Sequence, residues 1–101
     1  MMQYIEIIKN VLIEFRAQAY VSWANTHVVH GQTDKAIRAC DRALKLIPNM
    51  FDAYLARGIA YTEGKDYESA LEDFASALAV SPGHSETLTR MGVVYYYMGD
   101  F

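Results

Sequence analysis

The stretch that decides the fold runs from Phe51 to His84 and reads FDAYLARGIAYTEGKDYESALEDFASALAVSPGH. It contains two segments of helical periodicity, separated by the turn-forming sequence Gly64-Lys65-Asp66. Apolar and small residues recur in each segment at steps of three and four, the spacing that places side chains on one helix face. Because large residues alternate with glycine and alanine on these faces, two helices can approach closely. The stretch therefore predicts an antiparallel helical hairpin.

The same pattern recurs along the chain with a period of 34 residues. Its two prolines, Pro48 and Pro82, are separated by this period. The same offset pairs further residues: Tyr20 with Tyr54 and Leu88, Ala24 with Gly58 and Gly92, Tyr61 with Tyr95, Ala36 with Ala70, and Ala43-Leu44 with Ala77-Leu78. Agreement of proline, small and aromatic positions at one offset indicates an internal repeat.

At these positions the chain resembles the tetratricopeptide repeat family, whose helix–turn–helix unit has this order of aromatic, glycine, tyrosine, alanine and proline residues. The second unit carries nearly the whole motif, at Tyr54, Gly58, Tyr61, Ala70, Phe74, Ala77 and Pro82. The first unit fits more loosely, because His27 stands where a tyrosine is usual and Cys40 where a large aromatic residue is usual. The resemblance implies an all-α fold of antiparallel hairpins stacked as a right-handed superhelix, an α-solenoid.

The repeat pattern divides the chain into four segments. Residues 17–50 form the first unit, residues 51–84 the second, and residues 85–101 the first helix of an incomplete third. Residues 1–16 lie outside the pattern, but no glycine or proline interrupts the chain before Gly31, so we expect one long helix or two nearly collinear ones. This extension is apolar on more than one side, and such a helix is normally covered by another surface.

Three polar residues precede the expected helices as candidate caps. We expect Thr33 to cap a helix over about residues 34–46, Asn49 to cap one over about 50–63, and Asp66 to cap one over about 67–80. The last helix is expected over about residues 85–98.

Composition narrows the possible functions. The 101 residues carry a net charge of -3 and are 52% hydrophobic, so we expect no nucleic-acid partner and no disordered tract. No apolar run approaches the ~20 residues that cross a bilayer, so no membrane insertion is expected. The single cysteine cannot form an intramolecular disulfide, and the start lacks the features of a secretory signal. We therefore expect a cytoplasmic protein.

Charged side chains form one regular feature, a cationic stripe at helical spacing made of Lys35, Arg38, Arg42 and Lys45. We interpret it as a solvated helix face, the alternative being a surface for an anion or a membrane. Glu72 stands one period after Arg38, so opposite charges could face each other in the stack.

The sequence offers little for catalysis. His27 and His30 lie three residues apart, but a metal site needs a third or fourth ligand, and Cys40 is expected in the core. There is no glycine-rich phosphate loop and no nucleophile elbow. The adjacent carboxylates Glu72 and Asp73 should point apart into solvent. We expect no catalytic, metal-ligating or cofactor-binding residues, and hence no enzyme.

The family resemblance implies a concave face, built from the first helix of each unit, that binds a peptide or helix of a partner protein. Such a module would serve as a scaffold or adaptor in complex assembly. The residues expected on this face are Val21, Asn25, Asp52, Leu55, Ile59, Glu63, Glu86, Arg90, Val93 and Tyr97, with Gln18, Ser22 and Thr89 beside them.

Family members that grip the acidic tail of heat-shock chaperones use asparagines and cations on this face, and only Asn25 and Arg90 match here. Ala56, Val21 and Glu86 replace an asparagine and two lysines of that arrangement. Because the lost cations and the added carboxylate would repel a terminal carboxylate, we expect a partner with hydrophobic anchors and some positive charge instead.

The last helix lacks the second helix of its unit, and Tyr95-Tyr96-Tyr97-Met98 does not form the polar outer face of a cap. We hypothesise that this end, with Phe101, is covered by another subunit, by the apolar helix Met1–Phe15 of a second chain, or by residues of a longer parent protein. Self-association, as a homo-oligomer, is thus the alternative function. Its expected residues are Tyr4, Ile8, Met91, Tyr95 and Met98.

Overall fold

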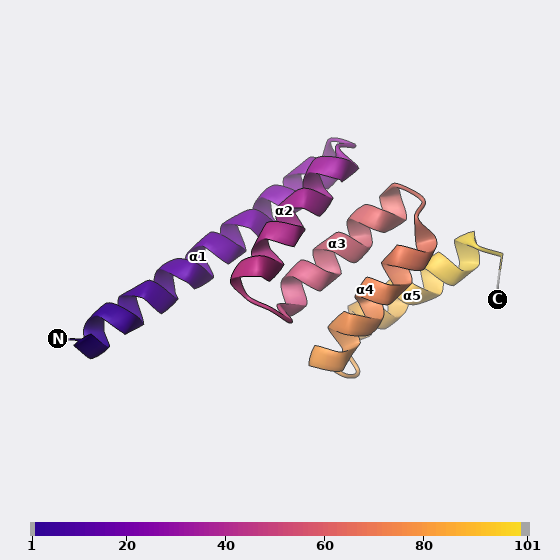
Figure 1. The fold of residues 1–101 in the computed structure, drawn as a ribbon. Helices are drawn as coiled ribbons and strands as arrows, with labels where there is room; N and C mark the ends of the chain where they lie inside the picture. Colours follow the sequence, from indigo (N-terminus) through magenta and orange to yellow (C-terminus); the bar gives the residue numbers. More distant parts are fainter. Residues whose placement is uncertain (1, 100–101) are drawn as a thin grey trace.

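In the computed structural model, which describes residues 2–99, the chain forms five α-helices and no strand over those residues. The helices are α1 (Met2–Val29), α2 (Thr33–Leu46), α3 (Phe51–Glu63), α4 (Tyr67–Val80) and α5 (Ser85–Tyr97). Successive helices run antiparallel and stack in one direction, giving extents of 58 × 29 × 16 Å (Figure 1). The expected all-α repeat solenoid is confirmed, whereas the expected role of Phe101 lies outside the described residues.

The backbone repeats with the sequence. Gly31, Lys65 and Gly99 all adopt positive φ angles, of 74°, 66° and 75°, and each follows the first helix of a unit. Asn49 and Gly83, which precede the second and third units, have φ angles of 62° and 80°. A left-handed residue ends a helix by satisfying its last carbonyl groups and reversing the chain. The turns thus recur with the 34-residue period seen in the sequence.

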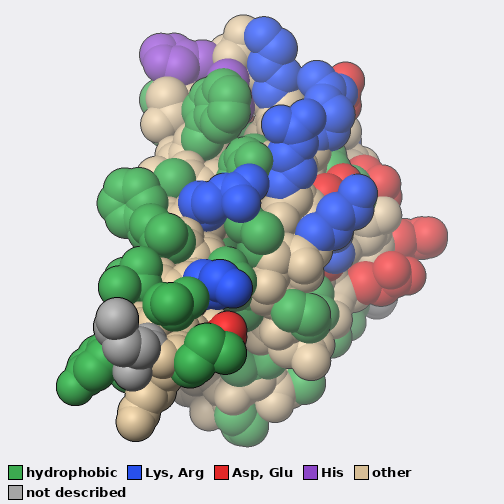
Figure 2. All heavy atoms as spheres, turned by 60° about the vertical axis from the view of Figure 1, so that its left-hand side comes forward, with side chains coloured by type: hydrophobic (Ala, Val, Ile, Leu, Met, Phe, Trp, Pro, Cys, Tyr) green, Lys and Arg blue, Asp and Glu red, His purple; other side chains and the backbone are tan. Residues whose placement is uncertain are grey.

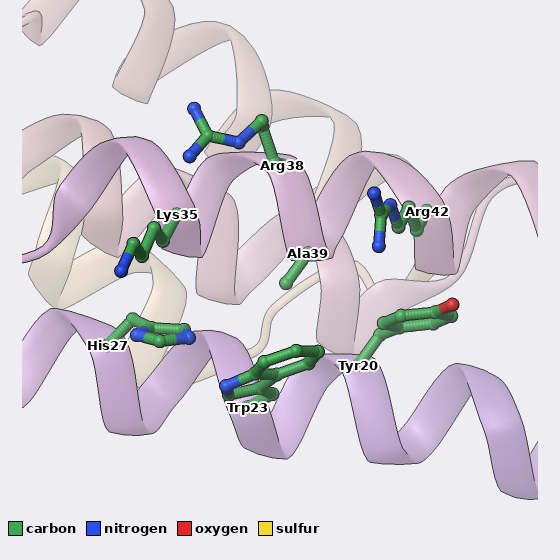
Figure 3. A pocket seen from close by; sticks show the side chains of 7 residues that line it. All are labelled: Tyr20, Trp23, His27, Lys35, Arg38, Ala39 and Arg42. Atoms are coloured by element: carbon green, nitrogen blue, oxygen red, sulfur yellow. The ribbon is translucent and has the colours of Figure 1, made fainter.

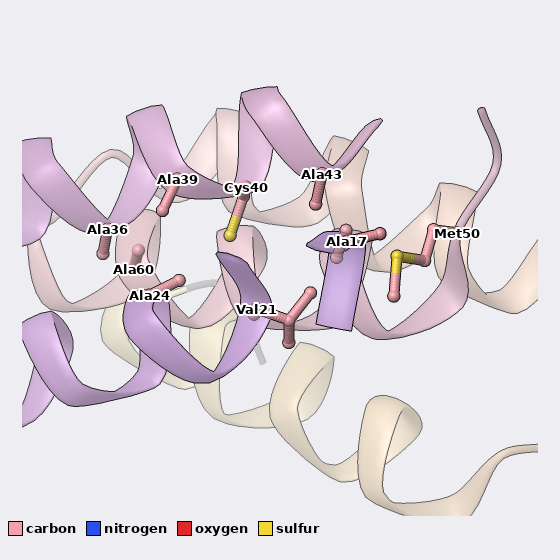
Figure 4. Packing of buried hydrophobic residues seen from close by; sticks show 11 residues of the cluster. Ala17, Val21, Ala24, Ala36, Ala39, Cys40, Ala43, Met50 and Ala60 are labelled. Carbon is pink, nitrogen blue, oxygen red and sulfur yellow. The ribbon is translucent and has the colours of Figure 1, made fainter. Parts of the chain in front are cut away.

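The core that joins the first unit to the second is built mainly from small side chains (Figure 4). Its fully buried members include Ala17, Ala24, Ala36, Cys40, Ala43, Ala53 and Ala60. Small residues let helix axes approach closely, which explains why alanine recurs at the repeat positions. A second cluster, around Phe74, Ala70 and Val94, joins α4 to α5.

Two of the three expected helix caps are wrong. Asp66 caps α4, where its carboxylate accepts a hydrogen bond from the Ser69 amide at 3.3 Å. Thr33 is already the first residue of α2, and the residue before it, Gln32, makes no side-chain capping bond. Asn49 has left-handed backbone geometry, and its Oδ1 accepts a hydrogen bond from the Tyr54 hydroxyl instead of from a helix amide.

The charge network around Arg57 was not expected from the sequence. Arg57 of α3 donates two hydrogen bonds to the carboxylate of Asp73 on α4, at 2.8 and 2.7 Å, and a third to Asp41 on α2, at 2.8 Å. Asp73 is only 4% exposed, so its expected place in solvent is wrong. Hydrogen bonding to Asp73 raises the pKa of Arg57 above its already high value. One guanidinium therefore ties three helices of two units together.

Helix α1 continues without interruption from the segment outside the repeat pattern into the first unit. From residue 2 to residue 16 only Ile13 is even half-buried, and Figure 1 shows this part projecting beyond the stack. Its large apolar side chains are therefore in water in the single chain.

Burial of Cys40 predicts a pH dependence of stability. The thiol is fully buried, and this burial raises its pKa from 9.0 to about 12. Between these pH values the unfolded chain releases the thiol proton and the folded chain keeps it, so the free energy of unfolding should fall by up to about 1.4 kcal/mol per pH unit. Urea unfolding at about pH 8 and about pH 10.5 should show a steeper fall for the native chain than for Cys40→Ala. Parallel pH curves for the two chains would contradict this assignment.

Candidate peptide-binding face

An open hollow of about 420 Å³ lies on one side of the stack, between the first helices of the three units. α1, α3 and α5 each contribute side chains to it, so it crosses both junctions between units. Its lining residues are Gln18, Val21, Ser22, Asn25, Asp52, Leu55, Ala56, Ile59, Glu86 and Arg90.

Most of the residues expected on the concave face are brought together here. Val21, Asn25, Asp52, Leu55, Ile59, Glu86 and Arg90 line the hollow. Glu63, Val93 and Tyr97 are exposed but do not line it, and the ring of Tyr97 stacks on Tyr67 with centroids 6.0 Å apart. The two aliphatic residues, Leu55 and Ile59, are half-buried and pack against the Phe74 cluster. These two residues give the hollow an apolar patch, here called its floor, which the core holds in place.

Polar contacts fix the rim of the hollow. Gln18 donates a hydrogen bond to Asp52 at 3.3 Å, which links the first two units across the surface. Arg90 forms an ion pair with Glu86, one helical turn away, at 3.1 Å. The carboxylate of Glu86 therefore lies beside the guanidinium of Arg90 on this rim. The expectation that an acidic chaperone tail does not fit stays a prediction.

The histidine pair does not form a metal site with other side chains. His27 Nδ1 lies 2.8 Å from the side-chain oxygen of Gln32, and His30 is exposed. In residues 2–99 no group of three or more His, Cys, Asp or Glu side chains is placed to hold a metal ion. None of the helices in this part of the chain is both long and apolar enough to cross a membrane.

The residues expected in self-association lie at both ends of the stack. Tyr4 and Ile8 on the projecting part of α1 are 68% and 57% exposed. On α5, Tyr95 is exposed, Met98 follows the helix and is exposed, and Met91 is half-buried against the Phe74 cluster. The structure therefore leaves apolar side chains uncovered at the two places expected from the sequence.

The stacked hairpins define an α-helical repeat protein with a hollow that crosses its units. The tetratricopeptide repeat family profile matches residues 21–85, more than half of the chain, and the chain belongs to this family. It is accordingly a protein–protein interaction module, of a family that is generally non-catalytic.

Three relatives illustrate the range of proteins to which the chain is similar. The chain is 26% identical over 85 residues to tetratricopeptide repeat protein 16 of Mus musculus and 27% identical over 85 residues to the anaphase-promoting complex subunit CDC16 of Saccharomyces cerevisiae. Each match covers 84% of this chain but only 11% and 10% of the relative. A 51-residue match, 37% identical, relates half of the chain to 3% of a UDP-N-acetylglucosamine--peptide N-acetylglucosaminyltransferase of Giardia intestinalis. The chain thus spans a small part of each relative.

Proposed function

We propose that the concave hollow binds a peptide or a helix of a partner protein, and that the chain acts as a scaffold or adaptor in assembling a complex. The observation that carries this proposal is the apolar floor of Leu55 and Ile59 on α3, which lies in the same hollow as Val21 of α1 and the carboxylate of Asp52. An amphipathic segment with apolar anchors at helical spacing and some Lys or Arg would match this surface.

The proposal is tested with peptides selected from a random display library on the native chain. Selected peptides should contain apolar anchors and basic residues, and Asp52→Lys should weaken their binding about tenfold or more by reversing an exposed rim charge. Ile59→Glu should abolish binding by placing a charge on the floor. Matched controls are Glu68→Lys and Val80→Glu, which make the same chemical changes at exposed positions of α4 outside the hollow. Equal binding to Asp52→Lys and Glu68→Lys would refute the concave site.

Self-association is a second candidate, favoured by the exposed apolar side chains of the projecting part of α1. Met2, Tyr4 and Phe15 are 81%, 68% and 72% exposed, and apolar faces of this extent usually mark an interaction surface. In this case Ile8→Glu or Tyr95→Glu should shift an oligomer to monomer in light scattering, while Ile59→Glu should leave the assembly intact.

A further inference from the structure

A second groove lies on the side of α1 opposite to the concave hollow, between α1 and α2 (Figure 3). The hollow is lined from α1 by Val21 and Asn25, whereas Tyr20, Trp23 and His27 line the groove. At about 100° per residue, these two sets point to opposite sides of the helix. The groove has a volume of about 250 Å³ and is also lined by Lys35, Arg38, Ala39 and Arg42 of α2.

The side chains of this groove are arranged in two facing rows. Figure 3 shows the rings of Tyr20, Trp23 and His27 along α1, with Ala39 opposite Trp23. Lys35 and Arg42 flank Ala39 and point toward the ring row from its two sides. Trp23 is 53% exposed, and its ring centroid lies 5.4 Å from that of His27. The groove thus has an aromatic wall that ends in a cation on each side.

Among the described residues 2–99, the cations of the groove have no carboxylate partner. Lys35, Arg38 and Arg42 are exposed, and within residues 2–99 none of them forms an ion pair with a carboxylate. Figure 2 shows Lys and Arg side chains gathered as a band beside hydrophobic side chains, with most of the visible Asp and Glu side chains toward the right-hand edge. The surface is therefore locally cationic although the whole chain has a net charge of -3.

Comparison with the second unit shows that stacking does not require these residues. One period later, the groove positions are occupied by Tyr54, Arg57, Tyr61, Ser69, Glu72, Asp73 and Ser76. There Arg57 takes the place of Trp23 and pairs with Asp73, which takes the place of Ala39. In the second unit, the ion pair between Arg57 and Asp73 closes the corresponding groove. Asp41, on α2 of the first unit, accepts a further hydrogen bond from Arg57. In the first unit the arginine and the aspartate are both missing, so the aromatic wall stays open.

We propose that this groove binds an acidic peptide segment of a partner protein. An aliphatic or aromatic side chain of the segment would lie against Trp23, and its carboxylates would pair with Lys35 and Arg42. Charge complementarity favours an acidic occupant. Arg57 stands at the repeat position of Trp23, and the carboxylate of Asp41 on α2 accepts a hydrogen bond from it. This contact shows that a carboxylate on a neighbouring helix can reach this position of a repeat. The volume lies below the ~300–1,000 Å³ of small-molecule sites, which suits one or two side chains of a peptide.

Trp23 provides the measurement, because it is the only tryptophan in the chain. The probe is a glutamate-rich peptide of about twelve residues with one central leucine, which has no fluorescence of its own. Adding it should change the emission of Trp23 until saturation, and raising the ionic strength should weaken binding because the groove is exposed. Replacing the glutamates by glutamine, or the leucine by glycine, should each weaken binding.

Matched charge variants separate the groove from the overall charge. Lys35→Glu with Arg42→Glu should weaken binding about tenfold or more. Lys9→Glu with Lys65→Glu makes the same change in net charge outside the groove and should keep binding within about twofold. All four residues are exposed, so the variants should fold, which far-UV circular dichroism checks. A dye-labelled form of the peptide, followed by anisotropy, extends the test to Trp23→Ala, which should also bind weakly.

Three results would overturn the proposal. The first is the absence of saturable binding, or equal loss of binding in the two double variants. The second is tighter binding of an oligothymidylate than of the peptide, which would assign the groove to nucleic acid. The third is a change in Trp23 emission when the protein is concentrated without peptide, provided that the double variant Lys35→Glu with Arg42→Glu does not show it. This result would assign the groove to a second copy of the chain.

Discussion

Phe74→Ala is expected to lower the free energy of unfolding by about 3–5 kcal/mol, the usual range for a large buried aromatic side chain. Phe74 is 1% exposed, and its cluster includes residues of α3, α4 and α5. A folded chain of this size has a total stability of roughly 5–15 kcal/mol, so this one change should remove a large part of it. Urea unfolding followed by far-UV circular dichroism measures the loss.

The contact between Phe74 and Gly58 gives this prediction a sharper form. A Cβ atom at Gly58 would lie 2.5 Å from Cε1 of Phe74, whereas a Cβ atom at Gly92 would meet nothing within 4 Å. These glycines are repeat equivalents, one in α3 and one in α5. Gly58→Ala should therefore destabilise the chain by about 1–3 kcal/mol through overpacking. Gly92→Ala should stabilise it by about 0.5–1 kcal/mol, because alanine favours a helix.

A double substitution tests whether the ring itself is responsible. In a Phe74→Leu background the destabilisation caused by Gly58→Ala should shrink, because the shorter side chain can move away from the added methyl group. If Gly58→Ala and Gly92→Ala change the free energy of unfolding with the same sign, then the close packing of α3 on Phe74 does not require a glycine at position 58.

Much of this architecture could be predicted from the sequence because it depends on a local period. Turn positions and small residues such as Gly58 and Ala77 repeat every 34 residues, so each unit supports the assignment of the next. The residues expected in the concave hollow came instead from the resemblance to the tetratricopeptide repeat family, which implies a binding face on the first helix of each unit. Glu63, Val93 and Tyr97 do not line it, since the hollow covers only part of each helix.

The features that the sequence did not predict depend on how two units meet. Asp73 adjoins Glu72 in the sequence, and only the packing of α4 on α3 shows that one carboxylate is buried and the other exposed. Asp41 and Asp73 each lie 16 residues from Arg57 in the sequence and on different helices from it. The spacing of residues within one helix therefore could not predict these pairs. The groove beside Trp23 was equally hidden. Its cations are on α2 and its rings on α1, so the sequence favoured an ordinary solvated stripe over a surface for an anion or a membrane.

The Arg57 network carries the second large prediction, which concerns how the units are joined. Asp73→Ala removes both hydrogen bonds that Asp73 accepts from Arg57 and leaves the guanidinium, whose side chain is 22% exposed, with one partner. Removing one partner of a buried ion pair typically destabilises a protein by about 3–5 kcal/mol, because the remaining charge stays desolvated. The free energy of unfolding, from urea titration, should fall by this amount.

Asp41 is the matched control within the same network. It pairs with the same guanidinium, at 2.8 Å, but its side chain is 46% exposed, so Asp41→Ala should change stability by only about 0–1 kcal/mol. Replacing both charged partners, by Arg57→Met with Asp73→Leu, should recover much of the stability lost in Asp73→Ala, since no unpaired buried charge remains. Equal losses for Asp41→Ala and Asp73→Ala would mean that burial does not set the strength of this junction. In that case the three charges would act as a surface network, and raising the salt concentration should weaken both pairs alike.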